Sequence, residues 1–483
     1  MKERKETRHK SDPEVKQPSG FLYRLQNFAL NYDFLLLFFC IFFVYNTVTR
    51  IDWSGDVFPA VFLPIFLIVK QTVFFDSLSI IGGLDPNLAY AFPLVNGHHV
   101  SLFPIVTPVL VTPVYFVSYL LYTVFSLPFD SAGIMILAKT SATIIAALSC
   151  VFVYLAGKEL FSKKIALFTA LVYAFATSTW SVSSQALWQH GTVELLLILM
   201  IWLIIRNERE PSRKKIIFLG LLSGLFIFNR PPDAVLLLPI IGYVIWYERQ
   251  NLPAYAISAA ATALPFLVYN FSIFGNVFGG YKQNLVLFSF GFESLRNFAG
   301  LLIAPNVGLL IFSPVLVLSV YGYLKLSSVP SERIRRVLIV FGPVILLEIL
   351  VYSFFAGWDS SVAYSYGQRF LTGLVPVLAI YTGIALNGLF IADPVTFRTR
   401  AIRSFIIILV VSSVIIQAIG VFLYPLYPDR STSAERTWDW DHSIIFESYG
   451  YGISHVDSVT TYSFPPLPPL FHLQSGNTGE ASP

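Results

Sequence analysis

The chain has 483 residues, of which 55% are hydrophobic and only 12% are charged, and its mean hydropathy is +0.68. A soluble protein carries roughly a quarter charged residues, so this composition excludes a water-soluble domain and predicts an integral membrane protein. The net charge of +4 does not indicate nucleic-acid binding, because most Lys and Arg residues stand in a few short clusters that are typical of loop anchors.

Apolar segments recur along the whole chain. They lie at 34–49, 103–125, 133–157, 165–180, 192–205, 216–228, 234–247, 252–273, 307–324, 337–355, 371–391 and 404–423. Because each span needs about 20 residues and no runs of alternating ten-residue strands occur, we predict an all-α polytopic transmembrane helical bundle of about 11–13 spans. The proline-broken stretch 57–75 is expected to be a helix lying in the membrane interface.

Basic clusters predict the orientation of the chain. They lie in the N-terminal tail and at 158–164, 206–215, 325–336 and 398–403. Because cytoplasmic loops are enriched in Lys and Arg, these segments are expected to lie on the cytoplasmic side of the membrane. The predicted parts are a cytoplasmic basic tail over 1–30, a transmembrane domain over 31–423 and an extracytoplasmic tail over 424–483, with a long first external loop at 51–102.

Polar residues outside these anchors gather on the predicted external side. They are Asp52, Asp56, Asp76, Asp85, His98, His99, Gln189, His190, Asn229, Arg230, Asp233, Tyr281, Lys282, Asp359, Gln368 and Arg369. Charges at membrane depth are expensive and usually functional. We interpret this clustering at one end of the bundle as an extracytoplasmic active site.

The order of several segments carries a family resemblance. After the long first external loop come NGHHVSLFPIVTPVLVTPVYF, SSQALWQHG, FNRPPDAV, YNFSIFGNVFGGY, NFAGLLIAPNVGLLIFSPVL and GWDSSVAYSYGQRFLTGLVPVLAIY. This series resembles the bacterial GT-C superfamily, in the branch related to protein O-mannosyltransferases and aminoarabinose lipid A transferases. The resemblance implies a membrane glycosyltransferase that moves a sugar from a polyprenyl-phosphate carrier to a lipid, glycan or protein acceptor outside the cytoplasm. It maps the catalytic acid onto Asp56.

The chemistry of sugar transfer also points to a carboxylate in the first external loop. A base must take the proton of the acceptor hydroxyl group, and Asp56 stands in a Ser-Gly-Asp turn soon after the first span. The alternative is an aspartate that caps the following helix. Many relatives carry an adjacent acidic pair where this loop has single acids, so Asp52, Asp76 and Asp85 are also candidates. A divalent cation is left open as a cofactor.

The leaving group is a lipid phosphate, which calls for a cation near the bilayer. Arg369 precedes the apolar segment at 371–391 and can bind phosphate oxygens bidentately. The alternative is an arginine that extends along the membrane interface. Lys282 and Arg230 are further candidates for donor binding, although Arg230 can instead pair with Asp233.

Histidine and aromatic residues supply further candidates. His190 can donate a hydrogen bond to a phosphate or sugar oxygen near neutral pH, and its neighbour Gln189 is a second donor-binding candidate. The alternative is a histidine packed between helix ends. His98 and His99 are adjacent and therefore diverge, which makes them a poor pair of metal ligands. Trp358 is a candidate for stacking on a sugar, although aromatic belts at the membrane interface explain most Trp and Tyr residues.

Ionisable residues inside apolar segments support a rival hypothesis. Lys139, Glu194 and Glu348 stand where a proton or ion relay would place them, as in a transporter or a flippase for lipid-linked sugars. Against this reading, no internal repeat is visible in the chain. The proline-rich tail over 424–483 either covers the mouth of the site or is a disordered end.

Overall fold

The structure is a computed structural model and describes residues 32–48, 54–78, 89–126, 131–359, 365–391, 396–424 and 434–454. These residues are almost entirely helical, and their only two strands form an antiparallel hairpin, β1 (Leu94–Val95) with β2 (His98–His99). The prediction of an all-α fold is confirmed. The candidates Asp52 and Asp85 lie outside the described residues.

The helices run through the whole described chain. In order they are α2 (Asp33–Tyr45), α3 (Phe58–Ile65), η1 (Phe66–Lys70), α5 (Val106–Val124), α6 (Ser131–Leu160), α7 (Lys163–Phe175), η3 (Thr179–Ser183), α8 (Gln189–Arg209), α9 (Arg213–Asn229), η4 (Pro231–Leu237), α10 (Leu238–Tyr247), η5 (Arg249–Asn251), α11 (Leu252–Phe274), η6 (Gly279–Leu287), α12 (Glu293–Ile303), α13 (Leu309–Phe312), η7 (Pro314–Val317), α14 (Leu318–Leu324), η8 (Leu326–Ser328), α15 (Glu332–Ser353), η9 (Thr372–Leu374), α17 (Val375–Ile391), α18 (Phe397–Phe422), α19 (Ala434–Thr437) and α20 (Ile444–Ser454).

Within the described residues, six helices are long and apolar enough to cross a membrane, judged by length and composition. They are Val106–Val124, Gly133–Leu160, Gln189–Arg209, Arg249–Phe274, Thr372–Phe390 and Phe397–Phe422. Four more apolar helices are shorter than 18 residues. Several predicted spans are therefore broken. The segment at 307–324, for example, divides into α13, η7 and α14, and the number of crossings stays a prediction.

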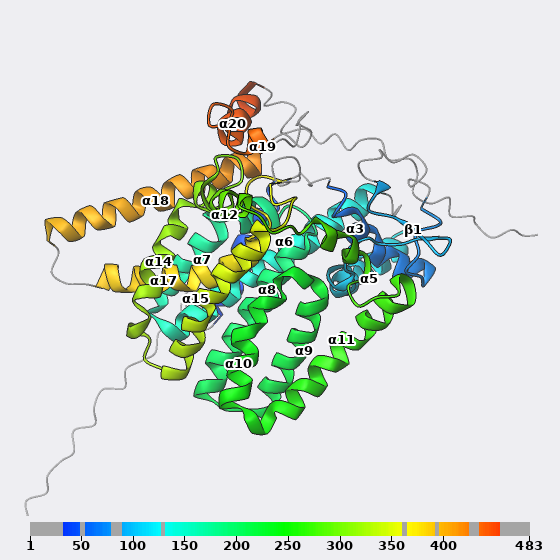
Figure 1. Ribbon diagram of the computed structural model, residues 1–483, viewed down its shortest axis with the longest axis horizontal. Coiled ribbons are helices and arrows are strands. Elements are labelled where there is room, and N and C mark those ends of the chain that lie inside the picture. Colours follow the sequence, from blue (N-terminus) through cyan, green and yellow to red (C-terminus); the bar gives the residue numbers. More distant parts are fainter. Residues whose placement is uncertain are drawn as a thin grey trace, which may run out of the picture.

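The core lies between long helices that pack side by side. Helix α6 packs against α7 and α8, and α17 packs against α7 and α14. Helices α9 and α11 form another closely packed pair, seen at the lower right of Figure 1. Small residues permit this approach, because a Cβ atom at Gly220 or Gly224 of α9 would overlap the backbone of α11. This use of glycine is typical of helix pairs in membranes.

The predicted interfacial stretch at 57–75 forms α3 and the π-helical turn η1. Residues 57–66 are all buried, and α3 packs against α5 and α6. The stretch thus packs inside the protein, and its position in the membrane interface stays a prediction. Pro59 lies in the first turn, where its missing N–H is tolerated, whereas Pro64 inside the helix cannot donate a backbone hydrogen bond, and the helix widens into η1 directly after it.

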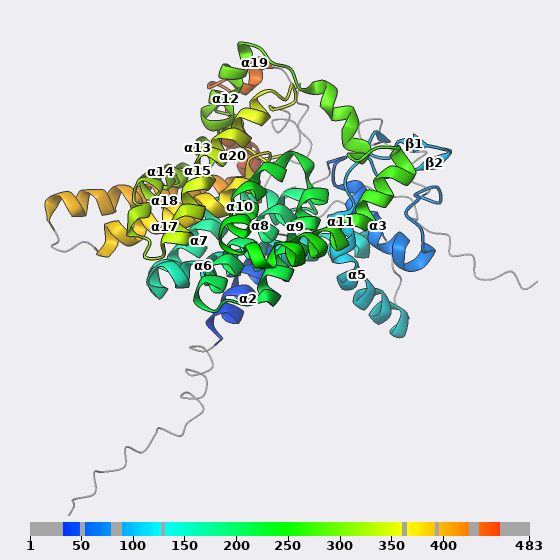
Figure 2. The same cartoon turned by 60° about the horizontal axis from the view of Figure 1, so that its bottom comes forward.

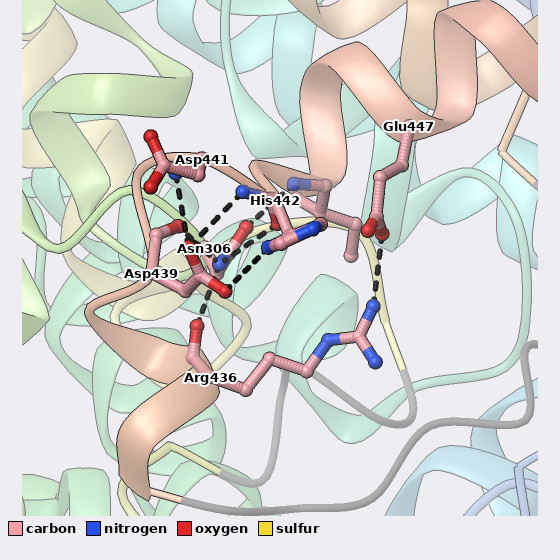
Figure 3. Close-up of polar contacts among 7 residues, drawn as sticks. Asn306, Arg436, Asp439, Asp441, His442 and Glu447 are labelled. Carbon is pink, nitrogen blue, oxygen red and sulfur yellow. Dashed lines mark hydrogen bonds and ion pairs between the residues drawn. The ribbon is translucent and has the colours of Figure 1, made fainter.

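Residues 434–454, which we name the cap, fold onto the rest of the protein through Asn306. The amide nitrogen of this side chain donates to the carbonyl oxygens of Arg436 (2.7 Å), Asp439 (3.1 Å) and His442 (3.4 Å), and its oxygen accepts from Ile444 N at 2.5 Å (Figure 3). In both Figure 1 and Figure 2, α19 of the cap lies beside α12. This part of the tail is thus an ordered part of the fold.

Candidate active site

The structure brings Asp56 and Arg369 together from opposite ends of the chain. Asp56 precedes α3 by two residues, and Arg369 precedes η9 by three. Asp56 Oδ2 lies 3.1 Å from Arg369 Nη2, and the two side chains are 23% and 5% exposed respectively. Helix α3 begins after Val57, and the Asp56 carboxylate points to other partners, so the capping alternative for Asp56 is wrong.

Aromatic rings enclose the Arg369 guanidinium. Its Cζ atom lies 5.0 Å from the centre of the Trp188 ring and 5.1 Å from that of Phe370. These cation–π contacts hold the guanidinium in a place that excludes most water, where its charge acts more strongly on an anion than it would in solution. An arginine buried this deeply in the protein does not extend into the membrane interface, so the alternative reading of Arg369 is wrong.

Polar groups without a hydrogen-bond partner surround Arg369. His190 lies between aromatic rings, with its centre 6.0 Å from that of Trp188 and 6.3 Å from that of Phe370. Within the described chain, neither ring nitrogen of His190 makes a hydrogen bond, and neither do the buried atoms Trp188 Nε1 and Gln368 Nε2. Buried polar atoms are nearly always satisfied in native proteins. These three side chains therefore have unused capacity for the oxygen atoms of a ligand.

Arg230 belongs to a buried network next to the site. Its Nη1 contacts Asp233 Oδ1 and the hydroxyl group of Tyr352, which in turn donates to Asp233 Oδ1 at 2.5 Å. The Tyr352 ring stacks on Phe370, with centres 5.6 Å apart and an interplanar angle of 21°. Arg230 thus pairs with Asp233, as the alternative interpretation of the sequence predicted. The guanidinium supports the wall of the site from within the protein.

Gln189 is held by two neighbouring helices. Its side-chain oxygen accepts from Tyr281 OH at 2.8 Å, and its backbone oxygen accepts from Asn229 Nδ2 at 2.9 Å. Asn229 Oδ1 accepts in turn from Thr107 Oγ1 at 2.7 Å. Burial raises the pKa of Tyr281 to about 12, while the charge of Arg230 acts in the opposite direction, so the phenol stays a neutral hydrogen-bond donor near neutral pH.

Other predicted residues do not join this site. Lys282 is exposed and makes no ion pair with the described residues, so its assignment to phosphate binding gains no support. Trp358 is buried against α12, where a Cβ at Gly300 would overlap its ring. Because this side chain is buried, the expectation that Trp358 stacks on a sugar gains no support.

Asp76, His98 and His99 form a separate cluster at the β-hairpin. Asp76 Oδ2 lies 2.6 Å from His98 Nδ1, and Asp76 Oδ1 accepts from His99 N at 2.7 Å. Slight burial raises the pKa of Asp76, but the hydrogen bonds from the two histidines outweigh it and lower the pKa below its usual value. The part of the chain that the structure describes contains no group of three His, Cys, Asp or Glu residues placed to hold a metal ion.

Three aromatic residues of the site were missed by the sequence analysis. Trp188 and Phe370 flank the guanidinium, and the Tyr90 hydroxyl group donates a hydrogen bond to Asp56 Oδ1. Because 16% of the chain is aromatic, an aromatic residue in the sequence does not by itself indicate a functional site. The glycine next to Asp56 is a weak sequence signal for a close neighbour. In the structure a Cβ at Gly55 would lie 2.5 Å from Tyr90 Cε1.

Comparisons with known proteins agree with this architecture. A family model described as dolichyl-phosphate-mannose-protein mannosyltransferase matches residues 112–273, which is less than half of the chain. No curated protein sequence matches the chain significantly.

Two crystal structures are similar over most of the chain. The oligosaccharyltransferase of Archaeoglobus fulgidus in its apo form has a TM-score of 0.50 at 11% identity, with 87% of this chain and 64% of that chain covered. This chain thus spans less than two thirds of the archaeal enzyme. ArnT of Cupriavidus metallidurans bound to undecaprenyl phosphate has a TM-score of 0.49 at 11% identity, covering 89% of this chain and 77% of that one. The protein thus has an all-α polytopic membrane fold that is similar to the fold of the archaeal oligosaccharyltransferase.

Proposed function

We propose that this chain is a membrane glycosyltransferase that transfers a sugar from a polyprenyl-phosphate carrier to an acceptor outside the cytoplasm. The observation that carries the proposal is the 3.1 Å pair of Asp56 and Arg369, which sets a carboxylate beside a buried cation. The family model that matches residues 112–273 is named for enzymes that use dolichyl-phosphate mannose, a sugar on a lipid phosphate. The GT-C fold adds support for sugar transfer.

Arg369 is the group best suited to the phosphate of the donor. Its guanidinium can offer N–H groups to phosphate oxygens while the rings of Trp188 and Phe370 keep water away. His190 and Gln368 supply neutral polar atoms that have no partner among the described residues. These groups stabilise the negative charge that grows on the phosphate as the bond to the sugar breaks.

Asp56 is the proposed general base. It takes the proton of the acceptor hydroxyl group, whose oxygen forms a bond to the anomeric carbon of the sugar. The bond between that carbon and the phosphate oxygen breaks, and its electron pair leaves with the polyprenyl phosphate. One proton and one glycosyl group are thus transferred, and the carrier is released as a phosphate monoester anion.

The orientation of the site follows from the basic clusters. The site lies at the N-terminal end of α8 and the C-terminal end of α9, and the opposite ends of both helices adjoin the basic cluster at 206–215. By the positive-inside rule this cluster faces the cytoplasm. The proposed location is the inner or plasma membrane, with the active site in the extracytoplasmic leaflet.

Sugar transfer by the purified protein tests the proposal. Wild type and Asp56→Asn are incubated in lipid with undecaprenyl-phosphate mannose, glucose or aminoarabinose and an extract of envelope acceptors. We expect Asp56→Asn to lose transfer by about 10²–10⁴-fold, the usual contribution of a general base. Asp76→Asn, in the same loop but in the separate hairpin cluster, is the matched control and should retain transfer.

Two outcomes would reject the proposal. A folded Asp56→Asn variant that transfers sugar at the wild-type rate would remove Asp56 from the reaction. Movement of a lipid-linked sugar across vesicles of purified protein, without any sugar transfer, would instead favour the transporter or flippase alternative.

A further inference from the structure

Tyr90 covers the Asp56 carboxylate in the structure. Asp56 Oδ2 lies 3.1 Å from Arg369 Nη2, while Oδ1 accepts a hydrogen bond from the Tyr90 hydroxyl group. The Tyr90 ring also lies over the neighbouring Gly55 and narrows the approach to the carboxylate from that side. A general base must accept a hydrogen bond from the group whose proton it removes. A hydroxyl group that is to bond to either oxygen of Asp56 therefore needs one of these two partners to move.

The two partners differ in how easily they can leave Asp56. Arg369 is charged, its side chain is 5% exposed, and aromatic rings hold it on two sides. Tyr90 is neutral and 43% exposed. Breaking a buried ion pair leaves an uncompensated charge, whereas a neutral hydrogen bond near the surface can be exchanged for a hydrogen bond from the acceptor at little cost. Tyr90 is therefore the partner that moves.

We propose that Tyr90 occupies the acceptor-hydroxyl subsite of Asp56 in the resting protein and is displaced by the acceptor. The inference rests on the proposed function, because it takes Asp56 as the base. The phenol makes the contact that an alcohol acceptor makes, an O–H group donated to Oδ1. The subsite thus fits an alcohol, such as the hydroxyl group of a sugar or of a serine side chain.

Covering the base also limits a wasteful reaction with water. If water takes the subsite, its proton passes to Asp56, its oxygen bonds to the anomeric carbon, and polyprenyl phosphate leaves with the electron pair. The products are free sugar and carrier. Tyr90 restricts this hydrolysis until an acceptor with enough binding contacts displaces it.

Gly55 permits this arrangement and supplies a second variant. A Cβ at this position would lie 2.5 Å from Tyr90 Cε1, so Gly55→Ala pushes the ring away without removing its hydroxyl group. Tyr90 packs edge to face on Phe103, with centres 6.3 Å apart, and Phe103 packs likewise on Tyr281 at 6.2 Å. One side of the Tyr90 ring thus packs in an aromatic row, while the residue remains 43% exposed.

Donor hydrolysis and acceptor kinetics test the proposal. Tyr90→Phe is assayed for release of free sugar from undecaprenyl-phosphate mannose, glucose or aminoarabinose without acceptor, and for transfer to glycerol. We expect hydrolysis to rise and the KM for glycerol to fall, each about fivefold, which is the effect of one neutral hydrogen bond, with kcat undiminished. Tyr449→Phe, at an exposed tyrosine of α20, is the control and should change neither.

The alternatives give different kinetics. A fall in kcat with unchanged KM would mean that Tyr90 orients Asp56, and no change in either would make it a bystander; both results overturn the inference. In an Asp56→Asn background, Tyr90→Phe should have no further effect. Full transfer by Asp56→Asn would reject the proposed function itself, whatever Tyr90 does.

Chemical labelling tests whether Tyr90 covers Asp56 and requires no sugar donor. Carbodiimide coupling of glycinamide to Asp56, followed by mass spectrometry of the intact membrane protein, reports access to the carboxylate. The coupling rate should rise in Tyr90→Phe and Gly55→Ala and stay unchanged in Tyr449→Phe. An unchanged rate in the first two variants overturns the inference. If wild type consumes no donor of the panel, the proposed function fails and this result still stands.

Discussion

The ring of Tyr366 lies on Gly420 of α18, where any Cβ atom would overlap it. The Tyr366 hydroxyl group donates to Ile416 O at 2.9 Å, and the ring packs edge to face on Phe312 and Tyr424. Because Tyr366 stands three residues before Arg369, these contacts fix the loop that positions the cation of the site. The geometry of the active site therefore depends on a helix that contributes no residue to it.

A side chain at Gly420 should disturb that loop. We expect Gly420→Ala to destabilise the protein by about 1–3 kcal/mol through overpacking and to lower sugar transfer, because Tyr366 has to move. Thermal unfolding in detergent and a transfer assay measure the two effects. Gly388→Ala is the control, since nothing lies within 4 Å of a Cβ there. Equal behaviour of the two variants would contradict the role of the Tyr366 contact.

Charge alone should not replace Arg369. Lysine keeps the positive charge but loses the planar guanidinium that lies between Trp188 and Phe370. We expect Arg369→Lys to lower kcat/KM for the lipid-linked donor by at least about tenfold, since two parallel hydrogen bonds to phosphate become one. Arg398→Lys, at the exposed start of α18, should leave the value unchanged. Wild-type kinetics in Arg369→Lys would reject bidentate phosphate binding.

The buried network of Arg230 should be important for stability. Asp233 is completely buried and pairs with Arg230, so Asp233→Asn leaves an uncompensated guanidinium and is expected to cost about 3–5 kcal/mol. Tyr352→Phe removes only a neutral donor and should cost about 1 kcal/mol. Denaturant unfolding of both variants measures the difference. A smaller loss in Asp233→Asn than in Tyr352→Phe would contradict this assignment.

The attachment of the cap should depend on pH. The hydrogen bond with Asp439 raises the pKa of His442. The contribution of protonated His442 to the stability of the cap is therefore full below the ordinary pKa of 6.5 and is lost as pH rises through the higher folded-state pKa. Hydrogen bonds from His442 lower the pKa of Asp439. The contribution of the Asp439 carboxylate to the stability of the cap is therefore present above pH 3.8 and is lost as pH falls through the lower folded-state pKa. The pair thus stabilises the cap most between about pH 4 and 6.5.

Hydrogen exchange of residues 434–454 across pH checks this dependence. In wild type, protection from hydrogen exchange should be greatest within that window and should fall above pH 6.5. In His442→Gln this fall above pH 6.5 should be absent. Because the side chains of His442 and Asp439 are 69% and 32% exposed, the pair contributes only part of the attachment, and Asn306 should keep the cap docked outside the window. A His442→Gln profile identical to wild type would contradict the role of the pair.

Sequence reasoning predicted the parts of this protein that depend on composition and chain direction. Low charge and repeated apolar segments indicate a helical membrane fold. Asp56 and Arg369 were both assigned to the side opposite the basic clusters, next to apolar segments, and the structure has them in contact. Their proximity was predictable because a membrane confines residues of one side to a thin layer.

The sequence could not predict which side chain of a polar pair faces inward. Lys282 was chosen over Tyr281, yet Tyr281 bonds to Gln189 while Lys282 is exposed, since neighbours on η6 point in different directions. Hydropathy also failed to reveal helix breaks. The run at 307–324 is apolar throughout, but it breaks near Ser313 and Pro314, and local backbone geometry is invisible to an average over residue types.

The docking of Asn306 onto the cap has a consequence for biosynthesis. The carbonyl groups that this side chain binds belong to residues that leave the ribosome some 130 positions later. Ile444 and Ile445, from the same late segment, pack with Tyr366 in one apolar cluster. A nascent chain can therefore insert all its earlier helices through the translocon and still lack the contacts that fix the arginine loop. The proposed catalytic site is therefore complete only after residues 434–454 have been translated and docked.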